Sequence, residues 1–258
     1  MTAAEQPMQQ ANGRLRGRVA VVTGASQGLG VVLAHRFGAE GADVALLARR
    51  ADRLDKLASE LGGSTVALPI PCDVTDPESV GNAFGDIGER WGQIDLLVNN
   101  AGVIGMALLE EATDEAILEM VSTNLLGSMF CARAAIPLLR AAGGGHIINI
   151  SSRSVELARP YLSVYSATKG GLETFSRTLA AELRPHAIRV STIRVGPLAT
   201  EPEVSTNEQA AAVTQEWVAR GGPAPEPPAP PESVADAVVF IATARPGARI
   251  PVVHLEPQ

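Results

Sequence analysis

A tyrosine and a lysine stand four residues apart in the stretch YLSVYSATKG, at residues 161–170. Tyr165 and Lys169 would share one face of a helix, with their Cβ atoms about 5–6 Å apart. An ammonium about 4 Å from a phenol favours the phenolate by roughly 4 kcal/mol at an effective dielectric near 20, or about 3 pKa units. We therefore expect Lys169 to lower the pKa of Tyr165 toward neutrality, where a phenol serves as a general acid or base. The alternative is a helix-surface pair without chemistry.

A glycine-rich turn follows the first apolar run, in the stretch TGASQGLG at residues 23–30. Glycine tolerates positive φ and lets the backbone approach a phosphate closely, and a helix N-terminus offers free N–H groups to an anion. We therefore predict a dinucleotide pyrophosphate site at this turn. The alternative is an ordinary strand–helix turn. The predicted cofactor residues here are Gly24, Ser26, Gln27, Gly28, Leu29 and Gly30.

The end of the second apolar run indicates which dinucleotide binds. In a dinucleotide fold an acid at this place binds the ribose of NAD, whereas an arginine accommodates the 2′-phosphate of NADP. The run ends LLARR, with Arg49 and Arg50 and no acid. Guanidinium groups grip a phosphate in a bidentate way, so we predict NADP(H) over NAD(H). The alternative is that one or both arginines are solvated charges at the start of the next helix.

Apolar runs alternate with helical patterns along the chain. This alternation predicts an α/β fold, a Rossmann-type, doubly wound parallel sheet with helices on both faces. The predicted strands lie at residues 18–24, 43–48, 64–74, 94–102, 145–152, 187–196 and 250–256. The predicted helices lie at residues 28–41, 50–61, 76–92, 114–140, 165–184 and 232–244.

The chain has 258 residues, which we divide into a disordered leader at 1–14 and a single domain at 15–258. A segment at about 199–231, ending in GGPAPEPPAPP, interrupts the alternation and is expected to close over the active site as a lid. Trp217 would cap an apolar substrate or pack on the core. Tyr161 would shape the substrate pocket or merely pack.

The composition excludes several classes of partner. The formal net charge is −7 and no basic run stands out, so we expect no nucleic-acid or membrane-surface binding. The start of the chain has no apolar signal segment and no apolar run reaches membrane-spanning length. Cys72 and Cys131 are expected to be buried free thiols. No metal-type cluster is visible, and we expect a cytoplasmic protein.

These motifs together resemble the single-domain short-chain dehydrogenases/reductases. They occur in that family's order and cover residues 18 to about 200. The matching pieces are TGASQGLG, CDV at 72–74, NNAG at 99–102, STNLLG around Asn124, INISSRS around Ser152, and YSATK.

The resemblance implies a role for each matching residue in a carbonyl reductase or alcohol dehydrogenase. Hydride transfer to a carbonyl creates a developing alkoxide, which needs a hydrogen-bond donor and a proton. Tyr165 would supply the proton, Ser152 would hold the oxygen, and Asn124 would hold a water that links Lys169 to solvent. Alternatively, Asn124 is a helix-interior residue bonded to backbone. The cofactor contacts implied by resemblance are Asp73 and Val74 at the adenine, Asn100, Ala101 and Gly102 after the fourth strand, Lys169 at the nicotinamide ribose, and Leu198 and Thr200 at the carboxamide.

The sequence also departs from the family pattern. Relatives usually carry Asn where Ser191 stands and Pro-Gly where Val195 and Gly196 stand, and the common VDGG ending is absent. The ending FIATARPGARIPVVHLEPQ resembles NADP-dependent relatives that oxidise 3-hydroxy acids. The substrate is therefore expected to be a small carbonyl or alcohol of ketone, 3-oxo acid or 3-hydroxy acid type.

Two other functions compete with this one. A non-catalytic NADP-binding regulator of the same fold would not need Ser152, Tyr165 and Lys169 together. A sugar-nucleotide epimerase would need a larger C-terminal domain than 258 residues allow. By resemblance, the apolar faces of the helices at 114–140 and 165–184 would pair subunits into a homodimer or homotetramer.

Overall fold

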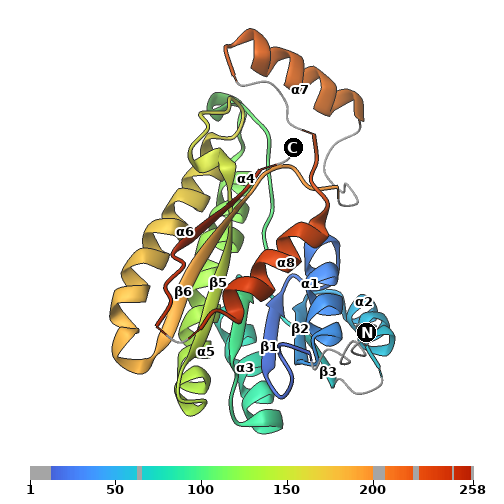
Figure 1. The fold of residues 1–258 in the computed structure, drawn as a ribbon. Helices are drawn as coiled ribbons and strands as arrows, with labels where there is room; N and C mark the ends of the chain where they lie inside the picture. Colours follow the sequence, from blue (N-terminus) through green and yellow to red (C-terminus); the bar gives the residue numbers. More distant parts are fainter. Residues whose placement is uncertain (1–12, 63–65, 200–206, 223–226, 246, 257–258) are drawn as a thin grey trace, which may run out of the picture.

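The computed structural model describes residues 13–62, 66–199, 207–222, 227–245 and 247–256 of the chain. Seven strands form one sheet in the order β3-β2-β1-β4-β5-β6-β7, and every neighbouring pair is parallel. This confirms the predicted Rossmann-type parallel sheet (Figure 1). The strands are β1 (Val19–Thr23), β2 (Asp43–Ala48), β3 (Ala67–Pro71), β4 (Leu96–Asn99), β5 (Gly145–Ser152), β6 (Ile188–Val195) and β7 (Val252–Leu255).

Helices cover both faces of the sheet (Figure 1). One apolar core lies between the sheet and α1, α2 and α8, and a second lies between the sheet and α3, α5 and α6. Two-sided burial explains why the strands are continuous apolar runs. The helices are α1 (Gly28–Ala39), α2 (Ala51–Glu60), α3 (Pro77–Trp91), η1 (Leu109–Glu111), α4 (Asp114–Val121), η2 (Ser122–Gly127), α5 (Ser128–Ala141), η3 (Arg153–Val155), α6 (Ser163–Glu182), η4 (Arg184–His186), α7 (Asn207–Ala219) and α8 (Pro231–Ala242).

The long helix predicted at 114–140 is helical throughout, but it contains a π-helical turn that the sequence did not predict. A π-helical turn, η2, separates α4 from α5. The turn brings Gly127 against Val74, where an added Cβ would lie only 2.8 Å from Val74 Cγ2. It also places Asn124 so that its carbonyl accepts a hydrogen bond from Ser128 at 3.1 Å. Single π-turns of this kind are frequent at functional sites.

Two further segments predicted from the sequence, the leader at 1–14 and the lid at 199–231, are described only in part. Residues 1–12 of the predicted leader at 1–14 lie outside the described residues. Arg14, at the end of the predicted leader, forms an ion pair with Glu40 at 2.6 Å. Within the predicted lid at 199–231, the described α7 stands apart from the sheet at one end of the molecule (Figure 1).

Candidate active site

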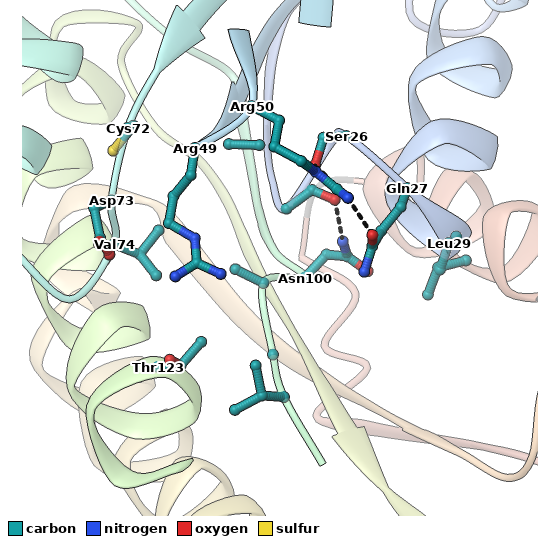
Figure 2. A pocket seen from close by; sticks show the side chains of 16 residues that line it. Ser26, Gln27, Leu29, Arg49, Arg50, Cys72, Asp73, Val74, Asn100 and Thr123 are labelled. Atoms are coloured by element: carbon teal, nitrogen blue, oxygen red, sulfur yellow. Dashed lines mark hydrogen bonds between the residues drawn. The ribbon is translucent and has the colours of Figure 1, made fainter. Parts of the chain in front are cut away.

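A cleft of about 330 Å³ opens beside the carboxyl ends of β1 to β4. This is the edge at which parallel α/β sheets bind ligands. Figure 2 shows side chains from all four strand ends gathered around it. The lining residues are Gly24, Ser26, Gln27, Gly28, Leu29, Ala48, Arg49, Arg50, Cys72, Asp73, Val74, Asn100, Ala101, Gly102, Val103 and Thr123.

The glycine turn fits an anionic group. Gly24 and Gly28 adopt positive φ angles of +67° and +53°. A Cβ on Gly24 would lie 2.8 Å from Ala101 Cα, so this position needs glycine. The side chain of Gln27, the N-cap residue of α1, makes no capping hydrogen bond within the described part of the chain. The first turn of this helix has no acidic residue. Its N–H groups are therefore available to a phosphate.

Thr23 ties this turn to the segment that follows β4. Its Oγ1 accepts hydrogen bonds from the backbone N–H groups of Asn100 and Ala101, both at 3.0 Å. Asn100 Nδ2 in turn donates to the carbonyl of Thr23 at 2.9 Å. The two walls of the cleft are thus joined, a role for Thr23 that sequence reasoning missed.

The two predicted arginines take different positions at the cleft. Arg50 Nη2 donates to Ser26 Oγ at 3.2 Å and to Gln27 Oε1. Arg49 is exposed and extends across the cleft toward Val74 (Figure 2). Asp73 is the one acid among the lining residues, and its carboxylate accepts hydrogen bonds from Thr75. This end of the cleft is therefore positively charged.

The predicted catalytic residues meet where α6 packs on β5. Ser152 ends β5, and Tyr165 and Lys169 lie on α6. The Lys169 ammonium donates to Ile150 O at 2.9 Å and lies 5.8 Å from the centroid of the Tyr165 ring. Ser152 lies close enough to the Tyr165 phenol to act on its pKa. Lys169 is buried, while Tyr165 remains partly exposed, as contact with a substrate requires.

The predicted acidification of Tyr165 is wrong for this structure. Burial raises the pKa of Tyr165 above its usual value, and the hydrogen bond from Ser152 opposes this rise only in part. Burial also lowers the pKa of Lys169 to about 8. Both shifts have one cause, because a low-dielectric surrounding disfavours the charged form of each group. The sequence showed the spacing of the pair but not its burial.

Asn124 and Gly102 connect the catalytic pair to the cleft. A Cβ on Gly102, which lines the cleft, would lie 3.2 Å from Asn124 Oδ1 and 3.4 Å from Lys169 Nζ. The Asn124 amide accepts from Val103 N at 2.8 Å and donates to Val103 O at 2.9 Å and to Thr168 Oγ1 at 3.2 Å. Its side chain therefore fixes the segment after β4 by bonding to backbone groups, as the alternative interpretation of Asn124 expected.

Some predicted cofactor residues do not line the cleft, and Tyr165 and Lys169 are among them. Gly30 lies behind the turn, where a Cβ would be 2.2 Å from Gly24 O. Leu198 pairs with Ala229 and packs on the core. Thr200 lies outside the described residues. The structure adds Ala48, Cys72, Val103 and Thr123 to the lining, and each is the sequence neighbour of a predicted residue.

Trp217 on α7 is buried against the segment that precedes α6. Its ring lies under the Arg159 guanidinium, 4.8 Å from it, and Gly222 lies directly against the indole. Both cysteines are buried free thiols, as predicted. Among the described helices, none has the length and apolar character needed to cross a membrane.

Comparison with known proteins agrees with this geometry. The L-sorbose reductase of Gluconobacter frateurii, solved with NADPH and L-sorbose, superposes with a TM-score of 0.83 at 30% identity over 95% of this chain and 97% of its own. The D-threitol dehydrogenase of Mycolicibacterium smegmatis is 35% identical over 78% of each chain. The NADP-dependent (R)-specific alcohol dehydrogenase of Lentilactobacillus kefiri is 34% identical over 72% of this chain and 75% of its own. The family model described as short chain dehydrogenase matches residues 18–211, and the chain belongs to that family.

Proposed function

We propose that the protein is an NADP(H)-dependent oxidoreductase that transfers a hydride between nicotinamide and a carbonyl or secondary alcohol. The observation that carries the proposal is the Lys169 ammonium beside Gly102, which lines a cleft whose rim holds two arginines. Tyr165 lies on the same helix as Lys169, and Ser152 ends the strand to which Lys169 is bonded. The NADP-dependent alcohol dehydrogenase and the NADPH-bound L-sorbose reductase among its relatives support the choice of cofactor and reaction.

The cleft residues fit NADP(H). The uncapped N-terminus of α1 and the close approach of Gly24 to Ala101 would hold the diphosphate. Arg49 and Arg50 would hold the 2′-phosphate, and Asp73 and Val74 would adjoin the adenine. When bound, the cofactor supplies a hydride to a carbonyl carbon or accepts one from an alcohol carbon.

The catalytic side chains supply the proton and the hydrogen bonds. Because the pKa of Tyr165 is raised, its phenol is protonated at neutral pH and can donate a proton to the substrate oxygen. The Ser152 hydroxyl stabilises negative charge on that oxygen by a hydrogen bond. The ammonium of Lys169, anchored on Ile150 O, stabilises the phenolate that Tyr165 leaves behind. In alcohol oxidation the same groups act in reverse.

We also propose that α7 forms the lid over the substrate, because Trp217 ties this helix to Arg159, six residues before Tyr165. A cytoplasmic location is supported by the free thiols of Cys72 and Cys131, which a reducing compartment maintains.

A second copy of the chain is the proposed protein partner. An apolar groove of about 400 Å³ runs between α4 and α6. Leu109, which lines it, is 62% exposed, and Leu118, which follows the lining residue Ile117 on α4, is 63% exposed. Exposed apolar surface of this kind marks interaction sites. We expect a homodimer or homotetramer in light scattering, and Leu118→Glu should release monomers. A wild-type protein that is monomeric at micromolar concentration would contradict this assembly.

The function is tested by nicotinamide absorbance with a panel of ketones, 3-oxo acids and secondary alcohols. Tyr165→Phe should lower kcat by about 100-fold or more while the Kd for NADPH stays within about twofold of the wild-type value. Arg49→Gln should weaken NADPH binding by about tenfold and leave NADH binding unchanged. Equal use of NADH and NADPH by the wild type would refute the phosphate site. NADPH binding without turnover of any panel member would favour a regulator.

A further inference from the structure

Helix α6 is joined to strand β5 by polar contacts in addition to apolar packing. The contacts follow one face of the helix and successive residues of the strand. They join Ser176 to Asn149 at 2.7 Å, Lys169 to Ile150 at 2.9 Å, and Glu173 to Ser151 at 2.8 Å. The next residue of the strand is Ser152, which meets Tyr165 on the same helix. The polar contacts therefore lead directly to the catalytic pair.

Glu173 is the unusual member of this set, because it is a carboxylate that is only 2% exposed. Burial acts to raise its pKa, but hydrogen bonds from Arg194 and Ser151 reverse this, so the pKa lies below its usual value and the group is ionised. Arg194 binds it in a bidentate way, with Nε at 2.8 Å from Oε1 and Nη2 at 2.6 Å from Oε2. A buried ion pair adds little net stability compared with apolar side chains of similar volume.

Arg194 is itself held in place from several sides. It lies on β6 directly opposite Ser151 in the register of the parallel pair. Beyond Glu173, its guanidinium contacts Glu156, which follows η3, and lies 3.1 Å from His254 Nε2 on β7. The guanidinium therefore fixes the Glu173 carboxylate relative to two strands of the sheet.

This arrangement controls where α6 stands along β5. Tyr165, Lys169 and Glu173 follow one another at intervals of four residues, so they share a helix face. Apolar contacts tolerate a small axial shift, whereas hydrogen bonds weaken steeply when distance and angle change. A shift of the helix by even one residue, about 1.5 Å, would separate the Tyr165 phenol from Ser152.

We propose that Glu173, held by Arg194, is a positioning residue that sets the placement of α6 on β5 and so keeps the Tyr165 phenol against Ser152. The inference rests on the proposed function, since it concerns the same proton donor. It assigns Glu173 no contact with substrate or cofactor.

The two tyrosines of the chain allow a direct test without turnover. Protein labelled with ¹³C at tyrosine Cζ gives two signals, which Tyr161→Phe assigns, and the Cζ shift reports hydrogen bonding of the phenol. Ser152→Ala gives the position of the Tyr165 signal without its partner. In Glu173→Gln the Tyr165 signal should move at least about halfway to that position, and kcat should fall by about tenfold or more. The Kd for NADPH should stay within about twofold.

The matched control is Glu40→Gln, which breaks the ion pair between Arg14 and Glu40, the residue that follows α1, and should leave the Tyr165 signal and kcat unchanged. Arg194→Lys keeps the positive charge but loses the bidentate contact with Glu173, so it should shift the Tyr165 signal in the same direction. This variant replaces Glu173→Gln in the test if Glu173→Gln does not fold. Wild-type signal and kcat in both variants, whatever their melting temperatures, would overturn the inference. A wild type without turnover refutes the proposed function instead, and the Tyr165 signal still decides the positioning.

Discussion

Lys169 is 4% exposed, and burial lowers its pKa from the usual 10.5 to about 8. Between these two values the unfolded chain binds a proton that the folded chain has released. The free energy of unfolding therefore rises with pH from about 8 to 10.5, and the full cost of burying the charge applies below pH 8. At neutral pH this cost is at most about 3.5 kcal/mol, from about 1.4 kcal/mol per pKa unit.

Lys169→Met should therefore make the protein more stable and inactive. We expect the free energy of unfolding at pH 7 to rise by about 1–2 kcal/mol, since the lost hydrogen bond to Ile150 offsets part of the gain. Urea titration at pH 7 and at pH 10 measures this, and the difference from wild type should shrink at the higher pH. Lys56→Met, at the other lysine of the chain, which is exposed, should change neither stability nor turnover. A less stable Lys169→Met protein would contradict the argument.

At the scale of residues, the sequence predicted which side chains meet but not what their surroundings do to them. The four-residue spacing of Tyr165 and Lys169 follows from helix geometry alone. The direction of the Tyr165 pKa shift depends on burial by other segments, which the spacing does not reveal. Glu173 stands four residues after Lys169, so the same spacing rule could have found it.

At the scale of elements, the strands were the most predictable parts. β2 and β5 begin and end where the apolar runs at 43–48 and 145–152 do. β4 is shorter than predicted, because Asn100 and Gly102 leave the sheet to line the cleft. The π-turn η2 was missed because a helical pattern continues through it, and its cause is the tertiary contacts of Asn124 and Gly127.

Helix α7 is held to the segment before α6 by side-chain contacts. The Arg159 guanidinium lies over the Trp217 ring, and the Arg220 guanidinium lies 5.9 Å from the Tyr161 ring. Glu216 lies close enough to the Tyr161 hydroxyl to raise its pKa. Tyr161 has a positive φ of +68°, and its carbonyl accepts from Ala107 N at 3.1 Å. A non-glycine residue in this conformation costs energy, so the surrounding contacts must hold it there.

Removing the Trp217 indole, which contacts Arg159, should loosen the proposed lid. We expect Trp217→Ala to raise the KM for the carbonyl substrate by about tenfold, because a loosened lid excludes water and orients substrate less well, while NADPH affinity stays at the wild-type level. Limited proteolysis should cut residues 207–222 faster than in the wild type. Trp91→Ala replaces the other tryptophan, which lies at the end of α3, and should change neither the KM nor the rate of proteolysis. An unchanged KM in Trp217→Ala would show that α7 does not close over the substrate.

At the scale of the whole molecule, alternation and burial were enough to predict a parallel sheet covered on both faces. The polar contacts that cross the sheet could not be predicted from the sequence, because they join residues far apart in the chain. His146 at the start of β5 lies 2.8 Å from Ser191 Oγ on β6, and that hydroxyl donates to Ile250 O at 2.5 Å. Ser191 has one hydrogen and gives it to Ile250, so His146 must donate from Nε2.

This contact makes His146 a group that must stay neutral for the fold to persist. It is 3% exposed, and its Nδ1 has no hydrogen-bond partner among the described residues. Protonation would place a second buried N–H there without an acceptor. Burial, aided by the nearby Arg189 guanidinium, lowers the pKa of His146 from 6.5 to about 3. Between pH 6.5 and 3 the unfolded chain therefore binds a proton that the folded chain does not bind. The free energy of unfolding falls as pH falls through this range.

His146→Gln should flatten this acid sensitivity, because glutamine can donate to Ser191 but does not titrate. A single histidine with these two pKa values removes about 2 kcal/mol from the free energy of unfolding between pH 7 and pH 5. Urea unfolding at the two pH values should show that the variant loses about 2 kcal/mol less than the wild type over this interval. His35→Gln, at an exposed histidine on α1, is the control and should keep the wild-type slope. Equal slopes in His146→Gln and the wild type would mean that His146 accepts its proton in the folded state, and that the contact with Ser191 does not keep it neutral.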